Sequence, residues 1–135
     1  MIAIIDYGVG NLFSLASSLK SLGLETKVTR DAAAIRAADH IILPGVGAFA
    51  DAMAKLEATG LVPVIKQEVE HKPLLGICLG MQLLFEKSYE YGEHTGLGLI
   101  PGEVCPLADD LKNPSLKVPH IGWNSLHLVR PENPL

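Results

Sequence analysis

The feature that most constrains the fold of this chain is a repeated order of segments, in which a short apolar run is followed by a segment with helical periodicity. The apolar runs cover residues 2–5, 40–43 and 74–78, and residues 25–29 form a further short run. Continuously apolar strands are typical of parallel sheets buried on both faces. The order therefore predicts an α/β fold, with an open, mostly parallel sheet, flanking helices and right-handed crossovers.

The segments between these runs have the pattern of amphipathic helices. Asn11 and Asp31 are each placed to cap the N-terminus of a helix. Two further segments, residues 49–56 and 61–70, carry apolar side chains on one helical face. We also expect a helix over residues 79–87, directly after the fourth strand.

The pattern changes beyond residue 88. Glycine and proline are dense over residues 89–114, where short extended runs replace the helices. Residues 117–129 predict one or two more strands around a break at Gly122. No helical segment follows to cover them. This ending is abrupt for a doubly wound sheet.

Composition limits the class of protein. Hydrophobic residues make up 48% and charged residues 19%, as in globular chains. A net charge of −4 without blocks of like charge argues against nucleic-acid binding, and no apolar run has the roughly 20 residues of a membrane helix. With Cys78 and Cys105 only, and no signal peptide, a reducing cytoplasm is expected. We expect Cys105 to pack as a small apolar residue.

The most informative motif is Gly-Ile-Cys-Leu-Gly-Met-Gln at residues 76–82. Cys78 stands between two glycines, at a predicted strand end and before a helix, which is the arrangement of a nucleophile elbow. A helix N-terminus stabilises a thiolate, and the backbone N–H of Leu79 is free to bind an oxyanion. Gln82 follows by four residues and shares a helical face with Cys78. A buried structural cysteine in a tight turn is the alternative.

A second glycine loop, Pro-Gly-Val-Gly at residues 44–47, follows the third strand. It lies at the same carboxyl edge of the sheet as Cys78, where open α/β sheets bind ligands. Gly47 lets a peptide N–H turn toward a developing oxyanion. An ordinary strand-to-helix turn is the alternative.

The turn Gly-Val-Gly-Asn at residues 8–11 has two of the three glycines of a dinucleotide fingerprint. The third position is Phe13, so the fingerprint fails. A tight turn with the Asn11 cap explains the motif, and contact with a partner stays open. No spacing of His, Cys or Asp indicates a metal site, so we expect neither a metal nor another cofactor.

Residues 119–124 read Pro-His-Ile-Gly-Trp-Asn. An exposed Trp123, with His120 close to it in sequence, could anchor a protein interface. Core packing of Trp123 is the alternative.

Together these motifs resemble the class I (triad) glutamine amidotransferases. The motifs at residues 76–82 and 44–47 mark that class. Those at residues 6–11 and 119–124 are similar to the glutaminase subunits of imidazole glycerol phosphate synthases, which act in histidine biosynthesis. The resemblance runs the whole length of the chain.

The resemblance implies that Cys78 attacks L-glutamine and that the ammonia passes to a (β/α)₈ cyclase in a heterodimer. There it would combine with a phosphoribulosyl aminoimidazole carboxamide nucleotide. By the same resemblance, Gly47 and Leu79 lie at the oxyanion hole and Gln82 helps to hold glutamine. The residues expected at the cyclase interface are Gly10, Asn11, His120 and Trp123.

One departure from the family pattern concerns the catalytic base. The family's thiol is activated by the histidine and glutamate of a downstream His-x-Glu motif, and no such motif follows Cys78 here. The resemblance implies that residues 1–135 are the N-terminal and central part of a single amidotransferase domain that lacks its last strands and a helix, with one edge or face of the sheet uncovered. We therefore expect this chain alone not to turn over glutamine. Two rival hypotheses are another cysteine hydrolase or peptidase on the same elbow, and a non-catalytic nucleotide-binding or flavodoxin-like module.

Overall fold

The computed structural model describes residues 1–113 and 115–132. Its first sheet has four parallel strands in the order β2-β1-β3-β4. This confirms the predicted α/β fold with an open parallel sheet. The fourth strand ends earlier than predicted, because the backbone turns sharply at Cys78. The strands are β1 (Ile2–Ile5), β2 (Thr26–Thr29), β3 (His40–Leu43) and β4 (Leu74–Gly76).

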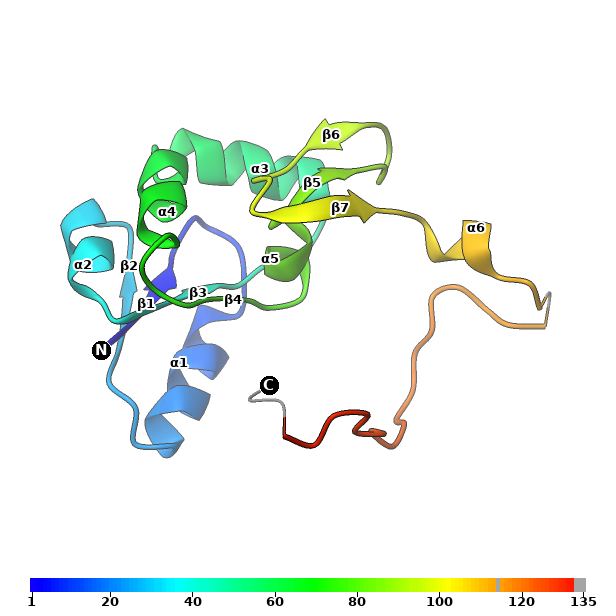
Figure 1. Ribbon diagram of the computed structural model, residues 1–135, viewed down its shortest axis with the longest axis horizontal. Helices are drawn as coiled ribbons and strands as arrows, with labels where there is room; N and C mark the ends of the chain where they lie inside the picture. The colour runs from blue at the N-terminus through cyan, green and yellow to red at the C-terminus, as the bar shows by residue number, and fades with distance from the viewer. Residues whose placement is uncertain (114, 133–135) are drawn as a thin grey trace.

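Helices lie on both faces of this sheet (Figure 1). One face is covered by α2 (Ala32–Ala37), α3 (Phe49–Ala58) and α4 (Val62–Glu68), and the other carries α1 (Leu12–Ser21). Both predicted caps are confirmed. The Asn11 side chain accepts a hydrogen bond from the Ser14 N–H at 3.3 Å, and the Asp31 side chain accepts one from the Ala33 N–H at 3.0 Å.

The two faces of the sheet are covered to different extents. The strand side chains on the face of α2, α3 and α4 join a single core cluster with Phe49, Met53 and Leu56. Side chains alternate along a strand, so Ile42 points to the opposite face, where it is buried. Its register partner Leu75 on β4 is 41% exposed, and β4 is an edge strand. The sheet therefore has an uncovered edge at β4, and beside it part of the face that carries α1 is also uncovered, as predicted.

A second sheet, of order β6-β5-β7, follows the cysteine motif. The predicted helix over residues 79–87 is wrong, because α5 (Leu79–Gln82) is a single turn. Leu84 accepts a hydrogen bond from the Leu99 N–H at 2.8 Å, so pairing with later residues replaces the helical bonds. The strands are β5 (Phe85–Ser88), β6 (His94–Thr95) and β7 (Ile100–Val104).

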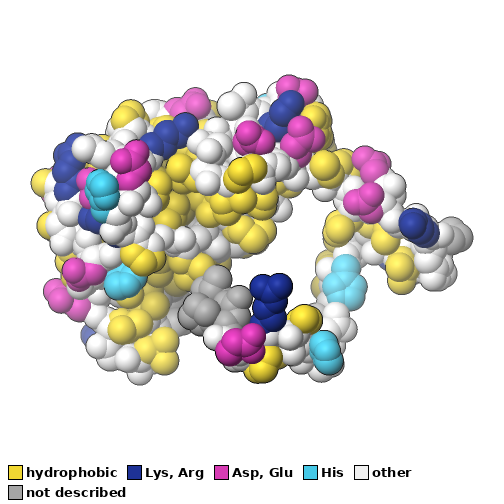
Figure 2. All heavy atoms as spheres, viewed as in Figure 1, with side chains coloured by type: hydrophobic (Ala, Val, Ile, Leu, Met, Phe, Trp, Pro, Cys, Tyr) yellow, Lys and Arg dark blue, Asp and Glu magenta, His cyan; other side chains and the backbone are white. Residues whose placement is uncertain are grey.

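Residues 106–113 and 115–132, here called the arm, lead away from the second sheet and curve back toward the side of α1 (Figure 1). The arm stands off from the rest of the molecule over much of its length (Figure 2). It begins with α6 (Leu107–Asp110), which buries no residue. The strands predicted over residues 117–129 are wrong, since this stretch has no strand and all its side chains are exposed. Extended backbone forms a strand only beside a partner.

Within the described parts of the chain, no helix combines the length and the apolar character needed to cross a bilayer.

Candidate nucleophile site

Cys78 occupies the turn between β4 and α5. Its backbone angles are φ +56° and ψ −120°, in a region that residues other than glycine adopt only at an energetic cost. Its side chain is exposed. The alternative of a buried structural cysteine is therefore wrong, and the geometry is that of a strained elbow that presents a thiol to solvent.

The elbow packs directly on the backbone of the neighbouring strand. A Cβ atom on Gly80 would lie 1.9 Å from the carbonyl oxygen of Leu43, so only glycine fits at this position. A Cβ atom on Gly45 would lie 2.5 Å from the backbone nitrogen of Gly80. The loop after β3 and the N-terminus of α5 are therefore in backbone contact. This contact brings the two predicted glycine motifs to one edge of the sheet.

Backbone N–H groups at this edge lack hydrogen-bond acceptors within the part of the chain that the structure describes. They belong to Leu79, the first residue of α5, and to residues 45–48. Gly47 has a φ of +97°, which glycine adopts without strain. Unpaired N–H groups beside a nucleophile can stabilise a developing negative oxygen. The sequence-predicted residues Gly47 and Leu79 thus lie on the two segments that meet beside Cys78.

Gln82 lies one helical turn beyond Cys78, because its N–H donates to the Cys78 carbonyl at 3.2 Å. Its side chain lines a cavity of about 410 Å³ between α5, β5 and the base of the arm. Glu90 lines the same cavity, and its Oε2 accepts a hydrogen bond at 2.6 Å from the N–H of Phe49, the first residue of α3. Sequence reasoning missed Glu90, because a contact between residues 41 positions apart has no local signal.

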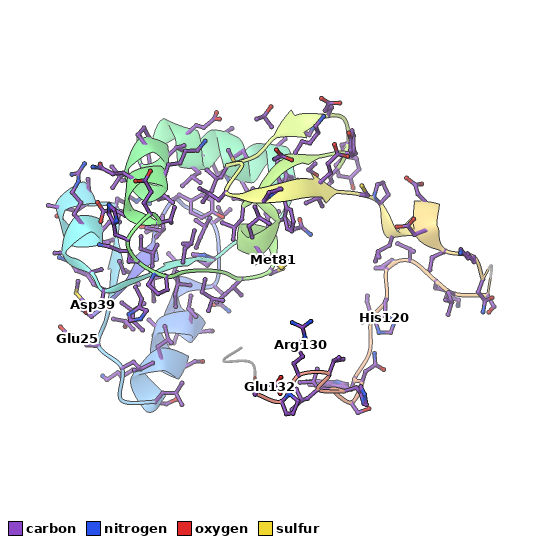
Figure 3. The ribbon with its side chains drawn as sticks, in the orientation of Figure 1. Glu25, Asp39, Met81, His120, Arg130 and Glu132 are labelled. Carbon is purple, nitrogen blue, oxygen red and sulfur yellow. The ribbon has the colours of Figure 1, made fainter. Side chains whose placement is uncertain are left out.

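No histidine is hydrogen-bonded to Cys78 among the described residues. His94 lies in β6, and the Nε2 atom of His120 pairs with the Asn124 side chain at 2.7 Å. Figure 3 shows His120 on the arm, well apart from Met81 of α5. The described residues therefore supply an exposed thiol and neighbouring N–H groups without acceptors, but no positioned base.

The sequence-predicted interface residues lie in two places. Gly10 and Asn11 form the turn between β1 and α1, whereas His120 and Trp123 lie in the arm, and no hydrogen bond joins the two pairs in the described structure. Trp123 is 103% exposed, so the alternative of core packing is wrong. Cys105 is also exposed, contrary to its predicted packing, because the chain leaves the second sheet after Val104.

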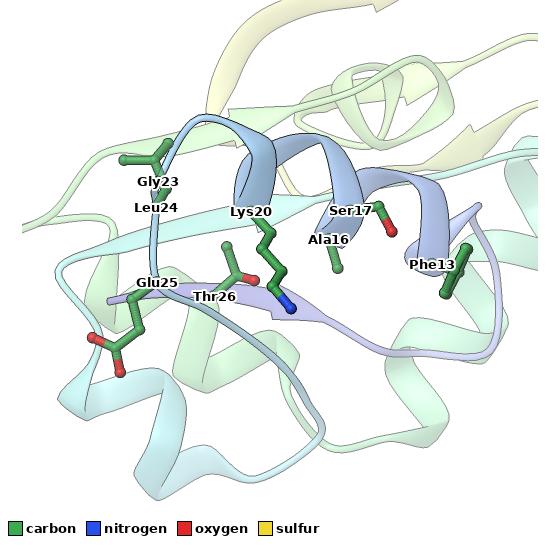
Figure 4. A pocket seen from close by; sticks show the side chains of 8 residues that line it. All are labelled: Phe13, Ala16, Ser17, Lys20, Gly23, Leu24, Glu25 and Thr26. Carbon is green, nitrogen blue, oxygen red and sulfur yellow. The ribbon is translucent and has the colours of Figure 1, made fainter.

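Two larger hollows flank α1. One of about 600 Å³ lies between α1 and β2, where Phe13, Lys20 and Glu25 contribute to its lining (Figure 4). The other, of about 660 Å³, lies beside α1 over β3 and β4. Cys78 lines neither of them. It also does not line the Gln82 cavity, whose cysteine is Cys105, but that cavity borders α5, the helix of the elbow. Among the described residues, no group of three or more His, Cys, Asp or Glu side chains could hold a metal ion.

Comparison with known families shows a match over residues 3–132 to the model described as "Glutamine amidotransferase class-I". Two similar curated proteins are named imidazole glycerol phosphate synthase subunit HisH. That of Syntrophotalea carbinolica is 49% identical and that of Aquifex aeolicus 54% identical. The alignments cover 97% and 91% of this chain, but 65% and 58% of those proteins. The chain thus spans about three fifths of the length of these relatives.

A solved structure titled "Crystal structure of glutamine amidotransferase" has the same fold. The two structures superpose with a TM-score of 0.66 at 23% sequence identity. The alignment covers 78% of this chain and 56% of the solved chain. At this identity the likeness supports the architecture alone.

Proposed function

Because this chain belongs to the class-I glutamine amidotransferase family, we propose that it is the nucleophile-bearing part of a glutaminase subunit of imidazole glycerol phosphate synthase. In this proposal, residues 1–135 are the N-terminal and central part of a single amidotransferase domain. The observation that carries the proposal is the strained, exposed Cys78 beside the N–H of Leu79, which has no acceptor among the described residues. The names of relatives about half identical to this chain support the choice of this family member.

The proposed reaction is acyl transfer to the thiol. The Cys78 thiolate attacks the side-chain amide carbon of glutamine, and the amide oxygen takes up the negative charge. The N–H groups of Leu79 and of the loop through Gly47 stabilise that oxygen. The leaving nitrogen takes up a proton, and collapse of the intermediate breaks the C–N bond, which releases ammonia and leaves a γ-glutamyl thioester on Cys78. Water then cleaves the thioester to give glutamate and free the thiol.

Two side chains of the neighbouring cavity fit the substrate. Gln82 offers an amide that can both donate to and accept from the polar ends of glutamine. Glu90 offers a carboxylate for the α-ammonium group, since one of its oxygens is already fixed by the Phe49 N–H. Both residues line the cavity at the elbow helix.

The proposed partner is a (β/α)₈ cyclase that receives the ammonia in a heterodimer. The exposure of Trp123 supports a place for the arm in this interface, and the exposed Asn11 next to Gly10 supports one for the β1–α1 turn. We place the reaction in the cytoplasm, because a free thiol nucleophile persists in a reducing compartment.

The test is covalent labelling with the chloroketone analogue of glutamine, 2-amino-4-oxo-5-chloropentanoate. The Cys78 sulfur displaces chloride and forms a thioether, which peptide mass mapping locates. We expect one adduct on Cys78, slower labelling with excess glutamine, and no adduct there in Cys78→Ala.

The two rival functions give different results in the same assay. Faster reaction of Cys78 with a peptidyl chloroketone than with the glutamine analogue would indicate a cysteine peptidase. Absence of Cys78 labelling by either reagent, with a nucleotide released on denaturation, would indicate a binding module.

A further inference from the structure

Tyr7 makes a buried contact with the loop that follows β3. It lies two residues beyond β1 and is 3% exposed. Its hydroxyl donates a hydrogen bond of 2.7 Å to the carbonyl oxygen of Pro44. The same hydroxyl would lie 2.9 Å from a Cβ atom on Gly45. Tyr7 thus fixes the orientation of the peptide between Pro44 and Gly45, the first of the glycine loop.

The far end of this loop is also fixed, while its middle is not. Glu90 holds the N–H of Phe49, and Tyr7 holds the carbonyl of Pro44. Between them, the N–H groups of residues 45–48 have no acceptor in the described chain, and Val46 and Gly47 are exposed. The loop is thus bonded at its two ends, and the donors between them are left unbonded.

We propose that Tyr7 is a positioning residue, whose hydroxyl sets the orientation of the loop donors that stabilise the oxyanion formed at Cys78. This assignment rests on the proposed amidotransfer reaction. Tyr7 acts through Pro44 and the loop, and its hydroxyl is too deeply buried to act as an acid or a base on solvent-exposed substrate atoms.

Peptide geometry explains how one hydroxyl orients the loop. In a planar trans peptide the carbonyl and the N–H point in opposite directions. Holding the Pro44 oxygen toward Tyr7 therefore turns the Gly45 N–H away from Tyr7. Gly45 packs against the backbone of Gly80 in the elbow helix, so the orientation of the Gly45 peptide is set directly beside Cys78. Burial raises the pKa of Tyr7 to about 12, which keeps the hydroxyl protonated and donating at neutral pH.

The proposal is tested with two alkylating reagents on the full 135-residue chain. The chloroketone analogue of glutamine has a carbonyl oxygen that can occupy the oxyanion position, whereas iodoacetamide alkylates the thiolate by direct displacement of iodide and needs no such donor. The measured quantity is the ratio of the two Cys78 labelling rates. Both rates are measured under conditions in which each variant is fully folded by its melting curve, because an unfolded thiol still reacts with iodoacetamide.

We expect Tyr7→Phe to lower this ratio about tenfold, because the donors are displaced rather than removed, and deletion of one donor costs about 10²–10³-fold. The matched control is Thr29→Val. Thr29 is also buried, and its hydroxyl accepts one hydrogen bond from the Asp31 N–H at the end of β2. We expect this control to have a similar melting temperature to Tyr7→Phe and the wild-type ratio.

A wild-type ratio in folded Tyr7→Phe would overturn the assignment, and so would an equal fall of the ratio in Thr29→Val. Should Tyr7→Phe lose its cooperative melting transition, para-aminophenylalanine at position 7 serves instead. It is a weaker donor of the same size. A ratio below that of the wild type therefore supports the proposal, and an unchanged ratio overturns it. Absence of Cys78 labelling in the wild-type protein by the chloroketone, with normal labelling by iodoacetamide, would refute the proposed amidotransfer and with it this role of Tyr7.

Discussion

The body of the molecule, residues 1–105, and the arm contain similar kinds of apolar side chain in opposite environments. In the body, Phe49 and Leu43 are completely buried. In the arm, Ile121, Leu126 and Trp123 are 87%, 91% and 103% exposed. Apolar side chains that are exposed in series mark an interaction surface. The body is therefore ordered by its own contacts, whereas the apolar residues of the arm are available to contacts outside the described chain.

The same division separates the chemical groups of the proposed reaction. The Cys78 thiol, the N–H groups proposed to bind the oxyanion, and the side chains of Gln82 and Glu90 belong to the body, whereas the exposed His120 belongs to the arm. No hydrogen bond connects His120 to the elbow among the described residues. The body therefore offers a nucleophilic site, and the arm offers a surface.

The largest effect expected from this division is the absence of turnover. The 135-residue chain, mixed with the cyclase and its nucleotide ligand, should not release glutamate from glutamine at an enzymatic rate. The leaving ammonia needs a proton, and the water that cleaves the thioester must lose one. A positioned base typically contributes about 10²–10⁴-fold to such transfers, and loss of the base can cost about as much as loss of the nucleophile.

Glutamate release is measured against Cys78→Ala as the control. Turnover that depends on Cys78 and reaches the order of 1 s⁻¹ would contradict the prediction. It would mean that a histidine of this chain, such as His94 or His120, reaches the elbow after all.

The second prediction concerns stability. Phe49→Ala should lower the free energy of unfolding by about 3–5 kcal/mol, because it leaves a cavity in the core beneath α3. Trp123→Ala removes a larger side chain, yet should change that free energy by no more than about 0.5 kcal/mol. Urea unfolding of the two variants beside the wild type gives both values. Comparable losses would mean that Trp123 packs against the body in solution.

The third prediction concerns association. In the proposed interface, Trp123 is the aromatic anchor, and such anchors contribute about 2 kcal/mol or more. Trp123→Ala should then weaken binding to the cyclase by roughly 30-fold or more, at about 1.4 kcal/mol per tenfold. Calorimetric titration of the cyclase with each folded variant measures this. A matched exposed substitution in the arm, Leu116→Ala, serves as the control, and equal affinities of all three chains would remove Trp123 from the interface.

Local signals explain which parts of the fold could be predicted from the sequence. The strands over residues 2–5 and 40–43 and the Asn11 and Asp31 caps depend on neighbouring residues, and the structure has them where they were expected. The predicted helix over residues 79–87 failed, because its apolar spacing is also satisfied by one helical turn followed by a strand. The pairing of β5 with β7 decided between the two, and that pairing is not local.

The same distinction between local signals and distant contacts applies to the residues of the site. Cys78, Leu79 and Gln82 belong to one contiguous motif, so the elbow could be read from the sequence. Tyr7 and Glu90 could not, since their partners Pro44 and Phe49 are 37 and 41 residues away. The roles of these two side chains depend on contacts with residues that are distant in sequence and that only the fold brings close.

The smallest predicted effect compares the two thiols, one in the elbow and one where the body meets the arm. Both cysteines are exposed, so access does not distinguish them. Cys78 directly precedes α5 and adjoins the N–H of Leu79, which has no acceptor among the described residues, and such a group favours negative charge by about 1 kcal/mol. Cys105 is separated from α6 by Pro106, which has no N–H. This difference should make Cys78 roughly five times more reactive, at about 1.4 kcal/mol per tenfold.

Limited alkylation with iodoacetamide, followed by peptide mass mapping, measures the ratio of the two labelling rates in the folded chain, and alkylation in urea supplies the unfolded reference. Equal rates in urea and faster labelling of Cys78 in the folded chain would attribute the reactivity to the fold. Preferential labelling of Cys105 in the folded chain would count against the elbow as the nucleophilic site, because the exposed thiol with fewer donors would then be the more reactive one.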